Sequence, residues 1–161
     1  MTSKQQQQQR HVRVGVGVLV KKDSSQNIYC GIRKGSHGAG SLALPGGHLE
    51  LNETWKECAR REIMEEMGVS IDNVEFAHVT NDIMKAENKH YVTIFMMATC
   101  TDEPINMEPH KCQGWKAYKW EELRDLNTHE PNKLFGPLAK LVEEEPQTVL
   151  DFVGGAASVA T

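Results

Sequence analysis

Apolar and polar residues alternate near the start of the chain, and this alternation predicts the first strand. Val12, Val14, Val16 and Val18 occupy every second position, and glycines stand among the residues between them. In a strand, every second side chain lies on the same face, so this spacing is typical of a strand with one apolar face. The other runs with strand character are residues 28–33, 42–44, 74–80, 91–100 and 115–120.

Two stretches have the spacing of amphipathic helices. The first is predicted over residues 54–67, because Thr54 and Glu57 have the form of a capping box and Gly68 can end the helix in the left-handed conformation. The second is predicted over residues 134–145, from leucines and a valine at helical intervals. Strands and helices that interleave in this way predict an α/β protein with a mixed sheet between helices.

The length of 161 residues fits one domain, expected at 11–153 between a glutamine-rich tail at 1–10 and a tail of small residues at 154–161. The net charge of −4 gives no basic surplus, so we expect no nucleic-acid polymer as partner. The apolar run at 14–20 is shorter than the ~18 residues of a membrane span. The four cysteines lack C-x-x-C spacing, which favours reduced thiols in a cytoplasmic protein over a zinc site, although it leaves a disulfide open.

The helix predicted at 54–67 carries acidic residues where its core-facing side should be apolar. With about 100° per residue, Glu62 and Glu66 fall inside the apolar stripe around Trp55, and Glu65 falls at its edge. Polar residues at core positions indicate function. A divalent cation with oxygen ligands would offset the repulsion between these carboxylates. A solvated acidic helix face is the alternative.

The same stretch resembles the signature of a known family. Residues 47–69 read Gly47-x5-Glu53-x7-Arg61-Glu62-Ile63-x-Glu65-Glu66-x-Gly68-Val69. This is similar to the Nudix box, G-x5-E-x7-R-E-U-x-E-E-x-G-U with U apolar, at every specified position. Further similarity, over about residues 12–142, is to the MutT-type branch that includes the thiopurine-nucleotide diphosphatase and the plant dihydroneopterin triphosphate pyrophosphohydrolases.

The resemblance implies a Nudix α/β/α sandwich in which the box forms a loop–helix–loop. It implies that Mg²⁺, or Mn²⁺ in its place, is held against a diphosphate by Glu62 and Glu66, with Glu65 close by and a backbone carbonyl of Gly46 or Gly47. By the same resemblance, Arg61 orients these glutamates and Glu53 braces Arg61. The last two act without touching the metal.

The substrate end of the site is also implied by the resemblance. Arg33, which precedes a glycine-rich loop at 34–41, would contact phosphate, and His48 would contact phosphate or substrate. The expected base pocket consists of Leu44, Thr93, Phe135 and Leu138. Relatives commonly have a tryptophan after Phe135, whereas this chain has Gly136, which puts the base preference in question. The tryptophans at 115 and 120 are expected in core or dimer-interface packing.

Phosphoanhydride hydrolysis needs neutralised phosphate oxygens and a water aimed at phosphorus. The general base for that water is left open between Glu65 or Glu66 on the helix and Glu103 or Glu108 on the 101–113 loop.

The leading hypothesis is Mg²⁺-dependent hydrolysis of nucleoside triphosphates, including oxidised or modified purine nucleotides, to a monophosphate and pyrophosphate. Such an activity would clean the nucleotide pool. Alternatives are dihydroneopterin triphosphate, ADP-ribose or NADH as substrate, mRNA cap hydrolysis, and a non-catalytic nucleotide-binding module. The resemblance also implies a homodimer.

Overall fold

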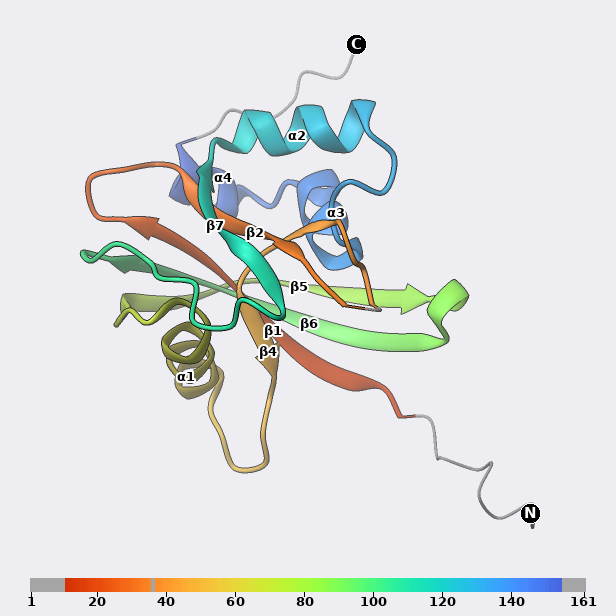
Figure 1. The fold of residues 1–161 in the computed structure, drawn as a ribbon, viewed down its shortest axis with the longest axis horizontal. Helices are drawn as coiled ribbons and strands as arrows, with labels where there is room; N and C mark the ends of the chain where they lie inside the picture. Colours follow the sequence, from red (N-terminus) through yellow and green to blue (C-terminus); the bar gives the residue numbers. More distant parts are fainter. Residues whose placement is uncertain (1–10, 36, 155–161) are drawn as a thin grey trace.

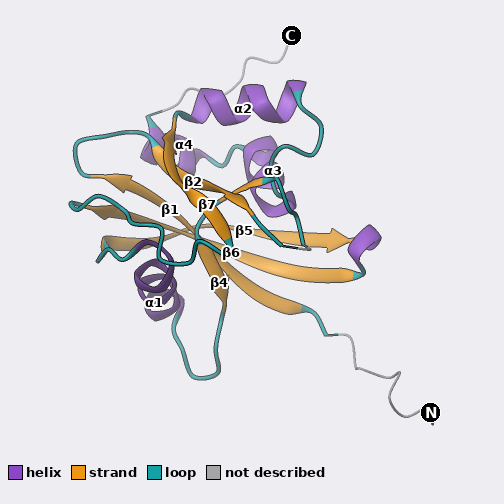
Figure 2. Ribbon diagram, in the orientation of Figure 1, coloured by secondary structure: helices purple, strands orange, loops and turns teal. Residues whose placement is uncertain are grey.

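The computed structural model describes residues 11–35 and 37–154. In the described residues, four strands precede the first α-helix and three α-helices follow the last strand, and the helices lie on both sides of the strands (Figures 1 and 2). The elements are β1 (Arg13–Lys22), β2 (Ile28–Arg33), β3 (Leu42–Ala43), β4 (Gly46–His48), α1 (Trp55–Met67), β5 (Asp72–Met84), the 3-10 turn η2 (Lys85–Glu87), β6 (Lys89–Cys100), β7 (Cys112–Tyr118), α2 (Trp120–His129), α3 (Gly136–Glu144) and α4 (Gln147–Val153).

The strands form one mixed sheet with β1 near its centre. The strand order is β3-β2-β1-β6-β5, with β4 paired to β1 and β7 paired to β2. The β1–β6 pair is parallel, and Gly15 lies opposite Thr93 in its register. The other pairs are antiparallel. The prediction of a mixed sheet between helices is confirmed.

The alternation in β1 builds two different faces of the sheet. Val16, Val18 and Val20 belong to the core under α1, together with Ile63 and Met67 of that helix. The opposite face carries Gly15 and Gly17, which have no side chains, and then Leu19 in the second core. Because successive strand residues point to opposite faces, the valines bind α1 and the glycines leave open space on the other side.

The second core lies on the face opposite α1, beneath the other three helices (Figure 1). Trp120 and Leu123 of α2, Leu138 and Leu141 of α3, and Leu150 of α4 are all buried there. Together the two cores clamp the sheet from both sides and fix the end of α1 relative to the end of α3.

Several element boundaries differ from the sequence predictions. The helix predicted at 54–67 is α1, with Thr54 as its N-cap in a capping box and Gly68 left-handed at φ 65°. The third strand ends at Ala43, and a separate strand, β4, follows at the glycine pair. Trp120, expected on a strand, is instead the first residue of α2, because Glu122 caps the turn that begins at Lys119. The helix predicted at 134–145 is α3, and α4 follows it as a further helix that was not predicted.

The predicted tails lie outside the described residues, apart from Gly154, which ends α4. All four cysteines are buried and free, as expected for reduced thiols. Within 11–35 and 37–154, no helix is long and apolar enough to cross a membrane.

Candidate active site

A cavity of about 670 Å³ opens between α1 and β4 on one side and the 33–44 segment with α3 on the other. It brings together the predicted site residues, except Glu53 and the general-base candidate Glu103. Those that line it are Arg33, Leu44, Gly46, Gly47, His48, Arg61, Glu62, Glu65, Glu66, Thr93, Phe135 and Leu138. Its size is that of a small-molecule site.

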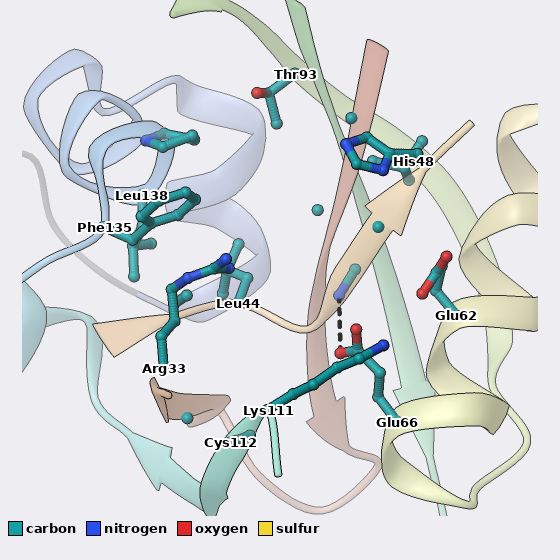
Figure 3. Close-up of a pocket in the computed structure, with 18 of the residues that line it drawn as sticks. Arg33, Leu44, His48, Glu62, Glu66, Thr93, Lys111, Cys112, Phe135 and Leu138 are labelled. Carbon is teal, nitrogen blue, oxygen red and sulfur yellow. Dashed lines mark hydrogen bonds between the residues drawn. The ribbon is translucent and has the colours of Figure 1, made fainter. Parts of the chain in front are cut away.

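Glu62 and Glu66 lie one turn apart on α1 and point toward β4 at one end of the cavity (Figure 3). The Glu62 side chain is only 12% exposed. The pKa of Glu66 is raised to about 8, mainly by burial and to a lesser extent by the carboxylates of Glu62 and Glu108. Burial is likewise the main reason that the pKa of Glu62 is raised. A divalent cation bound between the two carboxylates would stabilise their charged forms.

The backbone of β4 closes directly on these carboxylates. The Gly46 amide donates a hydrogen bond of 3.2 Å to Glu66 Oε2 (Figure 3). A Cβ placed on Gly47 would lie 2.3 Å from the carboxyl carbon of Glu62. Any other residue at this position would push the Glu62 carboxylate out of its place, so glycine here keeps that carboxylate against β4.

The donor set fits a hard divalent ion that keeps some of its water. In the described part of the chain, no three His, Cys, Asp or Glu side chains converge closely enough to hold a metal ion by themselves. Mg²⁺ is usually held by one or two carboxylates together with substrate phosphates, and Glu62 and Glu66 provide such a pair. The Asn106 Oδ1 atom is also buried at the cavity wall, with no hydrogen-bond partner among the described residues.

Arg61 is the centre of an ion-pair network behind the carboxylates. Its Nε and Nη2 donate to the two oxygens of Glu53 at 2.6 and 3.0 Å, and its Nη1 donates to Glu62 Oε1 at 2.7 Å. It also donates to the His48 carbonyl at 3.1 Å. Arg61 holds the pKa of Glu53 down at about 2. Glu53 thus lies outside the cavity and holds Arg61, which in turn holds Glu62.

Glu65 is more exposed than the other two glutamates. Its side chain is 53% exposed, and its nearest cation is Arg61 Nη1 at 3.4 Å. The structure therefore brings Glu62 and Glu66 together and leaves Glu65 at the rim.

Arg33 lies across the cavity from α1. Its guanidinium stacks over the Phe135 ring at 4.2 Å, and its Nε donates to the His37 carbonyl at 3.1 Å. Burial lowers its pKa, and the charge of Glu66 is the largest opposing influence. The side chain is thus held in place while the rest of its planar fork remains available to an anion.

Sequence reasoning missed Lys111, which follows the 101–110 loop and extends toward Glu66 (Figure 3). Lys111 Nζ donates to Glu108 Oε2 at 3.1 Å, and this bond raises the pKa of the lysine. The sequence signal was weak, because a lone lysine in a loop is usually a solvated surface residue. Lys111 reaches the site because the loop docks on the end of α1, where the Ile105 and Met107 amides donate to the carbonyls of Met67 and Glu66.

The four candidates for the general base have different surroundings. Glu103 lies outside the cavity in an ion pair with Lys22. Glu108 lines the cavity, and its side chain is 25% exposed. Of the two loop candidates, only Glu108 is therefore near the carboxylate pair.

The far end of the cavity is largely apolar. Leu44, Phe135 and Leu138 line it, and Thr93 supplies a hydroxyl group (Figure 3). Gly136 is the first residue of α3, and a Cβ there would lie 3.9 Å from the sulfur of Met84, which also lines the cavity. Met84 therefore borders the space that a larger residue at 136 would enter.

His48 and the two tryptophans have defined partners. The His48 ring stacks on Tyr91 and its Nε2 lies 3.0 Å from the Tyr91 hydroxyl, while burial lowers the histidine pKa. Trp115 Nε1 donates to the Glu66 carbonyl at 3.1 Å, so this residue supports the end of α1. Trp120 is 1% exposed in the second core. Trp120 is therefore a core residue, whereas the partly buried Trp115 lines the cavity.

Comparison with known proteins agrees with this geometry. The NUDIX domain family matches residues 11–141. The chain is 27% identical to the MutT NUDIX hydrolase of Burkholderia pseudomallei, covering 70% of this chain and 86% of that one with a TM-score of 0.64. A NUDIX hydrolase of Nitrosomonas europaea shares the fold at 18% identity, with coverage of 84% and 88% and a TM-score of 0.68.

A curated relative in Haloferax volcanii, the low-salt glycan biosynthesis protein Agl8, is 24% identical over 106 residues, which are 62% of this chain and 67% of the relative. Nudix hydrolases cleave nucleoside diphosphate derivatives and generally use divalent cations. The match over most of the chain and the complete box on α1 lead to one assignment: this protein belongs to the Nudix hydrolase family.

Proposed function

We propose that this protein hydrolyses nucleoside triphosphates to a nucleoside monophosphate and pyrophosphate with Mg²⁺, and that modified purine nucleotides are among its substrates. The observation that carries the proposal is the layout of the cavity, which has a desolvated carboxylate pair at one end and an apolar compartment at the other. Arg33 and Lys111 lie in the same cavity. A metal-bound polyphosphate fits the carboxylate end with Arg33 and Lys111, and an aromatic base fits the apolar compartment.

Each residue has a separate task in this reaction. Glu62 and Glu66 would hold the divalent cation, with Arg61 keeping Glu62 in position. The cation supplies charge neutralisation at the phosphate oxygens and makes a bound water easier to deprotonate. Arg33 and Lys111 bind phosphate oxygens. Glu108 accepts the proton of the attacking water, because Glu66 is engaged as a ligand and Glu65 points to the rim.

The experiment is a substrate panel with Mg²⁺ and separately with Mn²⁺, scored by release of pyrophosphate or orthophosphate. It should include canonical and oxidised nucleoside triphosphates, dihydroneopterin triphosphate, ADP-ribose, NADH and capped RNA. Pyrophosphate and a monophosphate from nucleoside triphosphates support the proposal. Cleavage confined to another substrate contradicts it, and binding without turnover of any of them indicates a nucleotide-binding module.

The partner proposal is a homodimer formed through a sheet face that α1 leaves uncovered. We define this uncovered face by Val12, Val14, Phe76, Val79 and Ile83, which are 36–58% exposed. They lie on the α1 side of β1 and β5, as the pairing of Val79 with Ile94 and of Phe76 with Met96 shows. β5 is also the edge strand of the sheet. An apolar face beside an open edge suits a second copy related by a two-fold axis.

The domain limits of 11–153 and a cytoplasmic location remain part of the proposal. Free cysteines in all four positions are compatible with a reducing compartment.

A further inference from the structure

A buried carboxylate lies next to the apolar compartment and takes no part in the proposed metal chemistry. Asp82 on β5 is 5% exposed. Its neighbours on the same face of the sheet include Thr80 on β5 and Thr93 on β6, which lie opposite each other in the β5–β6 register. Thr93 lines the cavity, whereas Asp82 and Thr80 are not part of its wall.

Both threonine hydroxyls donate to one oxygen of Asp82. The distance to Asp82 Oδ2 is 2.8 Å from Thr80 Oγ1 and 2.6 Å from Thr93 Oγ1. A hydroxyl has a single hydrogen to donate and two lone pairs that accept. Since Asp82 takes the hydrogen of Thr93, only the lone pairs of Thr93 remain for a ligand in the cavity.

The limitation of Thr93 to accepting hydrogen bonds matters because the other side chains considered at the apolar end of the cavity are not polar. Leu44, Phe135 and Leu138 offer no polar side-chain atoms to a bound ring. A ligand group buried against Thr93 without a matching hydrogen bond loses its bonds to water and gains none in return. A site built around a hydrogen bond rejects an analogue that lacks the partner more strongly than an apolar site rejects a change of size.

We infer that Asp82 is a positioning residue that fixes Thr93 as a hydrogen-bond acceptor, so that the site selects bases that present an N–H group to it, such as the lactam edge of 6-oxopurines. This inference rests on the proposed function and narrows its substrate class. It also accounts for a carboxylate buried among threonines, which packing alone does not require.

The test compares inosine triphosphate with purine riboside triphosphate, whose base has no N–H group. The wild-type protein is expected to favour inosine triphosphate by at least about tenfold in kcat/KM, the effect of one unmatched buried hydrogen bond. Thr93→Val removes the acceptor and should bring the ratio close to one. Thr80→Val removes the other hydroxyl on Asp82 but touches no ligand, so it should keep the wild-type ratio.

Asp82→Leu frees the Thr93 hydroxyl to donate into the cavity and should also bring the ratio close to one. Asp82→Asn retains an acceptor oxygen and should restore the preference, which a merely structural role would not produce. In a Thr93→Val background, Asp82→Leu should change the ratio no further. If Asp82→Leu fails to fold, the Thr93→Val and Asp82→Asn results still decide.

A wild-type ratio near one, or a preference that survives Thr93→Val, overturns the inference. If the wild-type protein hydrolyses no nucleoside triphosphate, the proposed function fails separately. The same ratio is then measured as the affinities of inosine and purine riboside monophosphates by calorimetry, and equal affinities overturn the inference.

Discussion

Glu62 and Glu66 lie one turn apart on α1, and burial disfavours the charged forms of both carboxylates. Glu66 loses hydration at the cavity end and faces Glu62 and Glu108, which together raise its pKa to about 8. The Gly46 amide offsets this only in part. Because of this raised pKa, the Glu66 carboxylate can hold a proton near neutral pH. Protons and Mg²⁺ should therefore compete for it.

The stability of the metal-free protein should therefore fall as pH rises from about 5 to about 8. Above the ordinary pKa of 4.5 the unfolded chain has released the Glu66 proton, whereas the folded chain keeps it up to about 8. Melting temperatures in EDTA across this range, for the wild-type protein and for Glu66→Gln, give the measurement. The difference between the two cancels the contributions of His37 and His48, whose lowered pKa values change stability with pH in the opposite direction.

Mg²⁺ should stabilise the wild-type protein more at pH 8 than at pH 5.5, since fewer protons compete for the site. The opposite trend, or the same pH slope in wild type and Glu66→Gln, would contradict the assignment of Glu66.

Glu62→Gln and Glu66→Gln should each lower kcat by more than about 100-fold, because a lost ligand costs more than the 10- to 100-fold typical of residues behind a metal site. Glu65→Gln is the matched control on the same turn, and its smaller loss follows from its exposed position. Circular dichroism checks that all three variants fold. Activity close to wild type in Glu62→Gln at matched Mg²⁺ would remove it from the metal site.

The residues that sequence could predict are those with a fixed spacing. Glu62 and Glu66 were found because the regular angle between helix residues places them within the apolar stripe, where carboxylates are not expected. Asp82 and Lys111 were missed because their roles arise from contacts between distant segments. Asp82 matters only through Thr93, eleven residues away, and Lys111 only through the docking of its loop on α1.

At the scale of elements, α1 is shorter than the sheet that it covers. Trp55 in its first turn is 44% exposed and lies 5.7 Å from the Phe76 ring. Beyond this point the uncovered face continues along β5 to Ile83. Apolar side chains gathered on one face typically mark an interface.

A charge on the uncovered face should therefore disrupt the proposed homodimer. Val79→Glu combined with Ile83→Lys should convert a dimer to a monomer in sedimentation or light-scattering measurements. Glu121→Lys on the exposed side of α2 is a control, since it changes charge far from this face. A wild-type monomer at micromolar concentration, or a dimer that survives the double substitution, would contradict this interface.

The strands were easier to predict than the connections between them. The valine alternation located β1, and its glycines gave the opposite face. β4 was missed because Gly46-Gly47-His48 has the composition of a loop, and it is a strand only because it pairs with β1. α2 and α4 were missed for a related reason: their burial against the second core, rather than their local pattern, holds them as helices.

At the scale of the whole molecule, the two ends of the cavity come from opposite sides of the sheet. The carboxylate pair comes from α1, and Arg33 comes from β2 with Phe135 stacked on it. Phosphate binding and metal binding can therefore be perturbed independently.

Arg33→Ala should raise KM for nucleoside triphosphates by about 10-fold or more, because it removes a charge-assisted bond to phosphate of about 1.5–3 kcal/mol. The concentration of Mg²⁺ needed for half-maximal activity should change little. Steady-state kinetics at several Mg²⁺ concentrations separates the two effects. Arg33→Lys keeps the charge but loses the planar fork, and its KM should lie between those of the wild type and the alanine variant. An unchanged KM would place Arg33 outside the site.

The two glycines of β1 that face the cavity, Gly15 and Gly17, affect how the ligand preference of this protein can change in evolution. Gly17 lies where an added methyl would come within 3.3 Å of Phe95 and 3.8 Å of Leu44, whereas one on Gly15 would meet Tyr91 at 3.7 Å. Neither position touches α1. A single methyl group at residue 17 would thus make the apolar compartment shallower for a bound ring, while the residues on α1 stay unchanged. Substitutions here can therefore change the size of ligand accepted without changing the hydrolytic residues.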